Sequence, residues 1–314
     1  MTAHQVITKE KPMSAKIEDT KWYSYTSSTQ TMRTWARRID TLADVPAEFQ
    51  AAFPRSVDPF PYTVYLPENK TPQASQQEPQ IICLFPDHFI LLEQRHGEVH
   101  SHTADLAEVV YLQRGLILLN SWLQIGTRAG VFDLYFNTAV DYLFKPITEG
   151  LRQETFALAG EGAPRTAKPG PDRSQFDFLD RANYKFMNYG RSSIPPNDDV
   201  LSLIYEPEHT LRAVRLFDKT IYRQYQTAQL AIVTDRELII IQEEKRIRNN
   251  FDPTHGGVFT YIPRRHLQAV TFASQPQPPY PHYVMDVSLP GDLHLTAEFS
   301  AANKELASFQ ALWG

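Results

Sequence analysis

The sequence predicts a mainly β fold of the α+β class, in which two similar antiparallel units follow each other along the chain. Short apolar or alternating runs, separated by Pro, Gly, Asp and Asn, fill most of the chain and are typical of antiparallel strands. One such run, Ile81–Gln94, has a counterpart in Leu230–Glu243, with Asp87 and Asp235 at equivalent places in the connecting turn. In each half the last run ends in Phe, directly before a pattern typical of an amphipathic helix.

The composition is that of an ordinary globular protein. The chain has 314 residues, which predicts about two domains. Hydrophobic residues make up 42% and charged residues 21%, and the mean hydropathy is -0.39, values that exclude collagen-like, strongly disordered and multi-span membrane proteins. The net charge of -5 argues against broad attraction to nucleic acid or to anionic membranes, although local basic patches remain compatible with it.

The single cysteine and the polar N-terminal residues predict the compartment. Cys83 has no second cysteine with which to close an intrachain disulfide, which favours a reducing compartment. Residues 1–22 lack the apolar core of a signal peptide, and no later stretch reaches the roughly 18 apolar residues that a membrane helix needs. We therefore expect a cytoplasmic protein without a transmembrane segment.

Residues 1–57 are predicted to form a partly disordered N-terminal appendage that packs on the first domain. Their first part is polar and shows little periodicity. The run from Trp35 to Ile39 fits either one face of a helix or an extended segment. Asp44 fits the cap of a short helix that has Pro46 in its first turn.

Residues 58–158 are predicted to form the first domain. Its apolar runs indicate about seven short strands, close enough along the chain to pair as hairpins. The predicted strands are Tyr62–Leu66, Ile81–Phe85, His88–Gln94, Glu98–His102, Leu106–Leu112, Leu116–Ile125 and Val131–Phe136.

A helix is predicted directly after the last of these strands, with Asn137 or Thr138 at its cap. Pro146 removes one hydrogen bond from the helix ladder, so we expect a kink that costs about 3 kcal/mol unless packing compensates for it. One apolar stripe would dock this helix on the sheet, and it comprises Val140, Leu143, Phe144, Ile147 and Leu151.

Residues 159–195 are predicted to link the two domains. Gly160–Arg173 combines Gly, Pro and charged residues without apolar periodicity, which marks a surface linker. Ser174–Tyr189 follows as a short amphipathic helix whose aromatic residues would contact a neighbouring domain.

Residues 196–314 are predicted to form the second domain. Leu293–Phe299 repeats the alternation of Val131–Phe136, and a terminal helix capped by Ser300 is expected after it. The second unit is longer than the first, so it needs longer loops, for which Asn249–Gly257 and Ser274–His282 are the predicted places.

The double pattern resembles the pleckstrin-homology-like (PH-like) superfold, and more closely its bacterial PH-like and GRAM-like relatives. The resemblance covers about residues 58–158 and 196–314 and depends on the strand pattern, the turn positions and the strand-to-helix ending. It implies two tandem PH-like barrels, each of about seven antiparallel strands closed by a C-terminal amphipathic helix. It also implies a non-catalytic binding or scaffold protein that recognises a protein or peptide partner along a sheet edge or beside the terminal helix.

The common motifs of cofactor and catalytic sites are missing from the sequence. It contains no GxGxxG, GxxxxGK[ST], HExxH, GxSxG or CxxC pattern. We therefore expect no cofactor and no enzymatic activity. An enzyme whose residues come together from distant positions is a remaining alternative.

A second binding hypothesis concerns anions. Eukaryotic PH domains often carry basic residues in the first and third loops between strands, where inositol phosphates bind. The corresponding loop of the first unit, Pro67–Pro79, has a single basic residue. The second unit is richer, so its loops predict a rim for anionic lipid or a small phosphorylated ligand, although neighbouring acidic residues partly cancel its field. The candidate ligands of that rim are Lys219, Arg223, Lys245, Arg246 and Arg248.

Two further groups of polar residues are interpreted as exposed surface. His96, His100 and His102 are spaced so that two imidazoles could share a metal ion, but the spacing supplies no third ligand, which favours a polar outer strand face. Arg264–His266 is predicted to be an exposed basic turn between strands.

Overall fold

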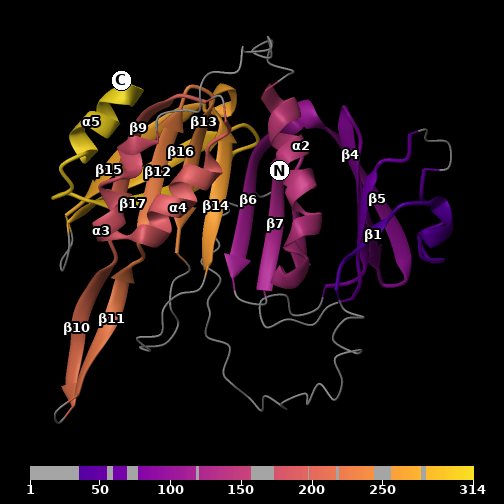
Figure 1. The fold of residues 1–314 in the computed structure, drawn as a ribbon, viewed down its shortest axis with the longest axis horizontal. Coiled ribbons are helices and arrows are strands. Elements are labelled where there is room, and N and C mark those ends of the chain that lie inside the picture. The colour runs from indigo at the N-terminus through magenta and orange to yellow at the C-terminus, as the bar shows by residue number, and fades with distance from the viewer. Residues whose placement is uncertain are drawn as a thin grey trace, which may run out of the picture.

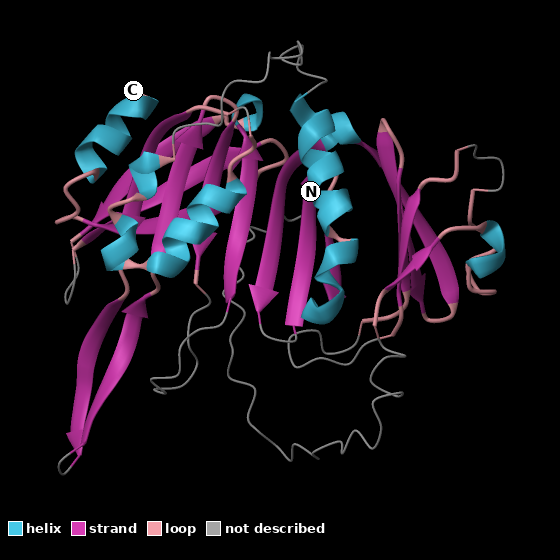
Figure 2. Ribbon diagram, viewed as in Figure 1, coloured by secondary structure: helices cyan, strands magenta, loops and turns pink. Residues whose placement is uncertain are grey.

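The structure, a computed structural model, describes residues 35–54, 59–68, 77–117, 120–156, 173–196, 198–216, 219–243, 256–276 and 281–314. These residues form four antiparallel sheets with helices packed against them (Figure 2). The predicted mainly β, antiparallel architecture is confirmed.

The first half of the chain supplies two groups of strands. A five-stranded sheet contains β1 (Arg37–Ile39), β2 (Tyr62–Leu66), β3 (Gln80–Leu84), β4 (His88–Arg95) and β5 (Glu98–Asp105), in that order. A 3₁₀ turn, Leu106–Glu108, then leads into three further paired strands, β6 (Val109–Ile117), β7 (Asn120–Thr127) and β8 (Val131–Phe136).

The predicted strand Leu116–Ile125 is wrong, because a hairpin divides it. β6 ends at Ile117 and β7 begins at Asn120. The two residues between these strands are both Leu, so the apolar run continues through the connection and hides it.

The helix after β8 begins with a 3₁₀ segment, Thr138–Leu143, and continues as α2 (Lys145–Phe156). The side chain of Asn137 accepts a hydrogen bond from the N–H of Ala139 at 2.9 Å, which confirms the predicted cap. Pro146 lies in the first turn of α2, where no partner for its missing N–H is needed. The expected interruption at Pro146 is therefore wrong; the non-helical backbone lies earlier, at Val140.

The second half repeats this order of elements. After the helices α3 (Leu179–Ala182) and α4 (Tyr184–Ser193), a 3₁₀ turn, Arg264–His266, separates two groups of strands, as Leu106–Glu108 does in the first half. The first group is β9 (Val200–Glu206), β10 (His209–Leu216), β11 (Lys219–Gln226), β12 (Gln229–Thr234), β13 (Glu237–Gln242) and β14 (Gly256–Pro263). The second group is β15 (Ala269–Gln275), β16 (His282–Leu289) and β17 (Leu293–Ser300), followed by α5 (Leu306–Gln310).

Two predicted helices in this half differ from expectation. The segment predicted as one helix at Ser174–Tyr189 is divided into a 3₁₀ turn, α3 and α4, because Asn183 ends α3 and caps α4 with its side chain. The terminal helix does not begin at Ser300: this hydroxyl accepts a hydrogen bond from the N–H of Ala302 at 3.0 Å in a turn, and α5 begins at Leu306. Residues 249–255 and 277–280 of the predicted long loops and residues 159–172 of the predicted linker lie outside the described residues.

One seven-stranded sheet spans both halves of the chain, in the order β8-β7-β6-β14-β13-β12-β9 (Figure 1). Its central junction pairs β6 with β14 from Leu112 opposite Tyr261 to Ile117 opposite Gly256. None of the sheets formed by the described strands closes into a barrel, so the expectation of closed barrels is wrong. The physical reason is that the chain turns at Leu106–Glu108, and β6 pairs with β14 instead of continuing beside β5.

Both faces of the seven-stranded sheet are covered by apolar packing. On one face α2, α4 and the five-stranded sheet share a large core that includes Phe89, Phe144 and Phe186. On the other face β15–β17 and α5 bury a second core around Ile240, Met285 and Phe299. The sheet is therefore the common wall between the two cores.

The described part of the N-terminal appendage packs on the first unit, as predicted. Ile39, Phe49 and Phe53 form a third core on the outer face of the five-stranded sheet. Trp35–Ile39 takes the extended alternative, because Arg37–Ile39 pairs with β2. Asp44 ends a 3₁₀ turn, Leu42–Asp44, instead of capping a helix.

Candidate interaction hairpin

The hairpin of β10 and β11 has no counterpart among the described elements of the first half. It forms a two-stranded sheet of its own and projects from the body of the molecule (Figure 1). The strands pair from His209 opposite Gln226 to Leu216 opposite Lys219, with an irregularity between Arg212 and Val214. This connection between β9 and β12 is the most protruding described part of the chain.

The pairing of β10 with β11 places residues of different types opposite one another. In this register Leu211, Val214 and Leu216 stand opposite Arg223, Ile221 and Lys219, and Arg212 and Arg215 stand opposite Tyr222 and Thr220. From His209 to Gln226 the sequence has four basic residues and one acidic residue. The hairpin is therefore basic in composition, and both of its strands carry basic residues.

Two of the predicted anion ligands belong to this hairpin. Lys219 begins β11 next to the hairpin tip, and Arg223 lies in its middle, opposite Leu211. Lys245, Arg246 and Arg248 lie outside the described residues. The shared basic rim therefore stays a prediction, whereas the hairpin groups Lys219 and Arg223 with Arg212 and Arg215 along one ribbon.

A buried carboxylate anchors the base of the hairpin. Glu206, the last residue of β9, is only 1% exposed. Its Oε1 lies 2.5 Å from Nε2 of His209, the first residue of β10. Its Oε2 accepts hydrogen bonds from the N–H of Ser300 at 3.0 Å and from Nδ2 of Asn303 at 2.8 Å. The carboxylate thus connects the hairpin to the end of β17.

Further hydrogen bonds fix the end of β11 and the end of β9 at the base of the hairpin. Gln226, the last residue of β11, donates its side-chain N–H to the carbonyl oxygen of Glu298 on β17. Nδ2 of Asn303 also lies 2.8 Å from the carbonyl oxygen of Tyr205, and the Tyr205 hydroxyl accepts from Nδ2 of Asn183 at 3.1 Å. The hairpin therefore leaves a fixed base that β17 and the start of α4 both contact.

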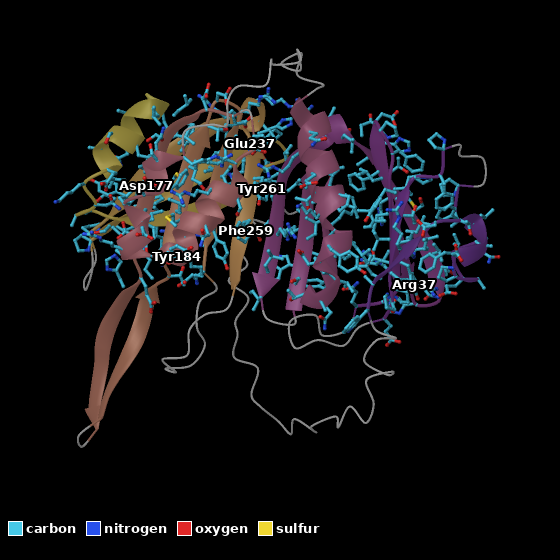
Figure 3. All side chains as sticks on the ribbon, in the orientation of Figure 1. Arg37, Asp177, Tyr184, Glu237, Phe259 and Tyr261 are labelled. Atoms are coloured by element: carbon cyan, nitrogen blue, oxygen red, sulfur yellow. The ribbon has the colours of Figure 1, made fainter. Side chains whose placement is uncertain are left out.

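The beginning of α4 presents an exposed aromatic ring close to this base. Tyr184, which follows Asn183, is 60% exposed, and Figure 3 shows it at the end of α4 nearer to the hairpin. The next residue of α4, Lys185, forms an ion pair with Glu243, the residue that follows β13. An exposed aromatic next to a basic ribbon is a combination that binding surfaces favour.

A second polar cluster lies where the two halves meet. Arg152 on α2 donates to both carboxylate oxygens of Glu237 on β13, at 3.1 and 2.5 Å, and to the carbonyl oxygen of Ser193 at 2.9 Å. The guanidinium carbon also lies 3.9 Å from the ring centroid of Tyr261, and Figure 3 shows Glu237 and Tyr261 on adjacent strands. The cavity beside these residues has room for about one water molecule and is therefore too small for an organic ligand. The cluster instead joins the two halves of the chain.

Asp198 is a buried acid near this cluster. Burial raises its pKa to about 6, and the neighbouring acidic residues Asp235 and Glu237 act in the same direction. Its Oδ2 accepts a hydrogen bond from the Thr234 hydroxyl at 3.4 Å, and Nε of Arg236 lies 3.6 Å from Oδ1. This carboxyl therefore loses its proton at a higher pH than an ordinary aspartate does.

The predicted basic turn at Arg264–His266 is only partly exposed. Arg264 and Arg265 are exposed, but His266 is buried, so the prediction is wrong for the histidine. Burial, followed by the charges of Arg265 and Arg128, lowers the pKa of His266 to about 4. Nε of Arg265 donates to Nε2 of His266 at 3.2 Å, which covers the ring and favours its neutral form.

The three histidines of the metal hypothesis lie around the β4–β5 turn. His96 occupies the turn with a φ of 52°, and His100 and His102 lie on β5. The ring of His102 is 5.5 Å from that of Phe132. Within the described ranges, no group of three His, Cys, Asp or Glu residues is placed to hold a metal ion.

The hairpin anchor was not predicted from the sequence. Glu206 and Asn303 are nearly a hundred residues apart, and neither stands in a recognisable motif. The one local signal is the Glu-Pro-Glu sequence that begins with Glu206, which marks the end of a strand.

Comparison of the chain with protein-family models, with curated proteins and with solved structures gives no match. Among the described helices, none has the length and apolar character needed to cross a membrane.

Proposed function

We propose that this protein is a non-catalytic binding protein with two tandem PH-like units, which holds an acidic protein partner on the β10–β11 hairpin. The observation that carries the proposal is the hairpin itself, a basic ribbon that projects from the sheets and is fixed at its base (Figure 1). The repeated order of two strand groups and a terminal helix supports the PH-like assignment.

The energetics of the hairpin favour a partner. A two-stranded hairpin alone in water is marginally stable at best, because it has no third strand and no packed core. The hairpin sequence nevertheless contains the apolar residues Leu211, Val214, Leu216 and Ile221. Burial of apolar residues against a partner would supply the missing stabilisation.

The charge of the hairpin selects the kind of partner. Four basic residues and one acidic residue lie between His209 and Gln226, in a chain whose net charge is -5. An acidic surface would therefore be attracted to the hairpin in preference to the rest of the molecule. Exposed charges of this kind are screened by salt, so binding should weaken as ionic strength rises.

Partner capture with matched variants tests this proposal. The immobilised wild type is compared with Arg212→Glu/Arg215→Glu on the hairpin and with Lys145→Glu/Lys304→Glu, which makes the same charge change at exposed positions elsewhere. An acidic partner should be retained by the wild type and by the control pair and be lost from the hairpin variant. Retention of the same partner by a folded hairpin variant would contradict the proposal.

A second candidate function is binding to an anionic bilayer. It is favoured by the hairpin tip, where Leu216 lies opposite Lys219 and Phe217 stands between them in the sequence. Vesicles of phosphatidylserine and phosphatidylcholine, compared with pure phosphatidylcholine at low and high salt, separate the two candidates. Salt-sensitive sedimentation that Lys219→Glu or Lys245→Glu/Arg246→Glu/Arg248→Glu abolishes would favour the bilayer; no sedimentation would leave the protein partner.

A further inference from the structure

The junction between the two halves joins strands with different places in the repeated unit. β14 is the last strand before the 3₁₀ turn of the second half, and β6 is the first strand after the 3₁₀ turn of the first half. The two turns have the same backbone form: the residues before them have φ and ψ of -66° and 146° at Asp105 and of -60° and 129° at Pro263. Each repeated unit therefore has one strand edge directly before its 3₁₀ turn and another directly after it, and the junction pairs one edge of each kind.

The equivalent edges at the two ends of the chain remain open among the described strands. β5 occupies the place of β14 in the first half, and its sole described neighbour is β4. β15 occupies the place of β6 in the second half, and its sole described neighbour is β16. Figure 1 shows β5 and β15 toward opposite ends of the long axis.

Hydrogen-bond alternation identifies the groups on the outer edge of β5. The N–H of Phe85 donates to the carbonyl oxygen of His88 at 2.9 Å, so alternate residues of β4 from His88 onward bond to β3. The intervening residues Leu91 and Glu93 bond to β5, opposite His102 and His100. The remaining backbone groups of β5 point away from β4, and they belong to Val99, Ser101 and Thr103.

The same alternation applies to β15. The N–H of Ala301 donates to the carbonyl oxygen of Pro281 at 3.0 Å, which assigns alternate residues of β16, from Tyr283 onward, to β17. Val284 and Asp286 then bond to β15, opposite Ala273 and Thr271. The outer backbone groups of β15 belong to Val270, Phe272 and Ser274.

Superposition of the repeat predicts how these two edges would meet. In the existing junction, Tyr261, Phe259 and Gly257 lie opposite Leu112, Arg114 and Leu116. Counting residues from the two 3₁₀ turns, Thr103, Ser101 and Val99 of β5 correspond to Tyr261, Phe259 and Gly257 of β14. In the same way, Val270, Phe272 and Ser274 of β15 correspond to Leu112, Arg114 and Leu116 of β6. Every outward N–H and C=O on one edge therefore faces an outward group on the other.

Side chains at the junction have matching counterparts. Across β6 and β14, Nε2 of Gln113 donates to Oγ1 of Thr260 at 3.0 Å. The corresponding residues on the open edges are Thr271 and His102, again a hydroxyl opposite a nitrogen-bearing side chain.

Neither open edge carries the Lys or Pro that commonly protects an edge strand against pairing. β15 has no charged residue at all, and its Val270 and Phe272 are only partly covered by the second core.

We propose that the occupant of these edges is a second copy of the chain, with β15 of one molecule paired antiparallel to β5 of the next. The contact is head-to-tail, because it uses a different surface on each partner, and it leaves one open edge at each end of the assembly. It therefore repeats until a filament or a ring forms. Neither edge includes the hairpin, so self-assembly and partner binding can be tested separately.

Two proline variants test the contact. Ser101→Pro and Ser274→Pro each remove one outward N–H, at exposed positions whose N–H groups make no bond within the described sheets. Ser101→Ala and Ser274→Ala are the controls, because they keep the N–H. Sedimentation velocity over a range of concentrations gives the mass of each species.

The expected results distinguish a head-to-tail contact from any symmetric one. The wild type and both alanine controls should increase in mass with concentration, and each proline variant alone should stay a monomer. An equimolar mixture of the two proline variants should give a dimer, a twofold rise in mass, because one intact β15 edge meets one intact β5 edge. Ser101→Lys and Ser274→Lys repeat the experiment if a proline variant fails to fold, as judged by circular dichroism.

Three outcomes would overturn the proposal. The first is a wild type that stays monomeric at every concentration. The second is assembly of a folded proline or lysine variant to the same extent as the wild type. The third is a mixture of the two folded variants that stays monomeric.

Discussion

Replacing Arg152 by Met would leave the carboxylate of Glu237 buried without the guanidinium that now binds both of its oxygens. The Glu237 side chain is only 1% exposed and that of Arg152 is 14% exposed, so water cannot readily replace the lost partner. Breaking a buried pair by removing one member costs about 3–5 kcal/mol. We therefore expect Arg152→Met to lower the free energy of unfolding by about that amount.

A double variant separates this cost from the value of the pair itself. Arg152→Met/Glu237→Leu removes both charges, and replacing a buried pair by apolar residues of similar volume is often neutral. It should therefore be more stable than Arg152→Met alone. Urea unfolding followed by circular dichroism and Trp fluorescence measures the wild type, the single variants Arg152→Met and Glu237→Leu, and the double variant.

Because Arg152 belongs to the first half and Glu237 to the second, the same data report the coupling between halves. The wild type should unfold in one transition, and Arg152→Met should separate the two optical signals. A loss below about 1 kcal/mol in Arg152→Met, with coincident transitions, would refute the assignment of this cluster as the joint between the halves.

Three further predictions concern buried groups. Because burial raises the pKa of Asp198 to about 6, the folded state holds the proton of this carboxyl more tightly than the unfolded state does, and the stability of the protein should fall as pH rises from about 4 to 6. Asp198→Asn should flatten that part of a profile of melting temperature against pH. An unchanged slope in the variant would contradict this prediction. Glu206→Ala should leave the N–H of Ser300 without its acceptor and cost about 1–3 kcal/mol, with faster proteolysis between His209 and Gln226; the proteolytic rate of the wild type would argue against the anchor. Burial raises the pKa of Cys83 to about 12, so a thiol reagent at pH 8 should label the unfolded chain and spare the native one, and rapid native labelling would disprove that burial.

The pattern of apolar and polar residues was sufficient to predict the elements whose strands, turns and helices follow one another directly in the sequence. The β3–β4 and β12–β13 hairpins were predicted, because short apolar runs flank an Asp-containing turn in each. The strand β8 and the helix after it were predicted for the same reason, and the side chain of Asn137 makes the expected cap.

Contacts between distant segments were beyond such reasoning. The sequence of β6 does not indicate whether this strand pairs with β14 or with β5, because both strands offer the same backbone hydrogen-bonding groups. The anchor of the hairpin was missed because Glu206 and Asn303 meet only in the folded chain. The hairpin itself was interpreted as loops with a basic rim, since its alternation serves no described core.

The pairing of β6 with β14 also sets the order in which a nascent chain can complete its structure. β6 leaves the ribosome long before β14 is synthesised, so the β6 edge stays without its strand while the intervening segments emerge. An unpaired edge is a site at which other chains can add. Translation beyond Pro263, and not the end of the first unit, is therefore the point at which the β6 edge becomes protected from such contacts.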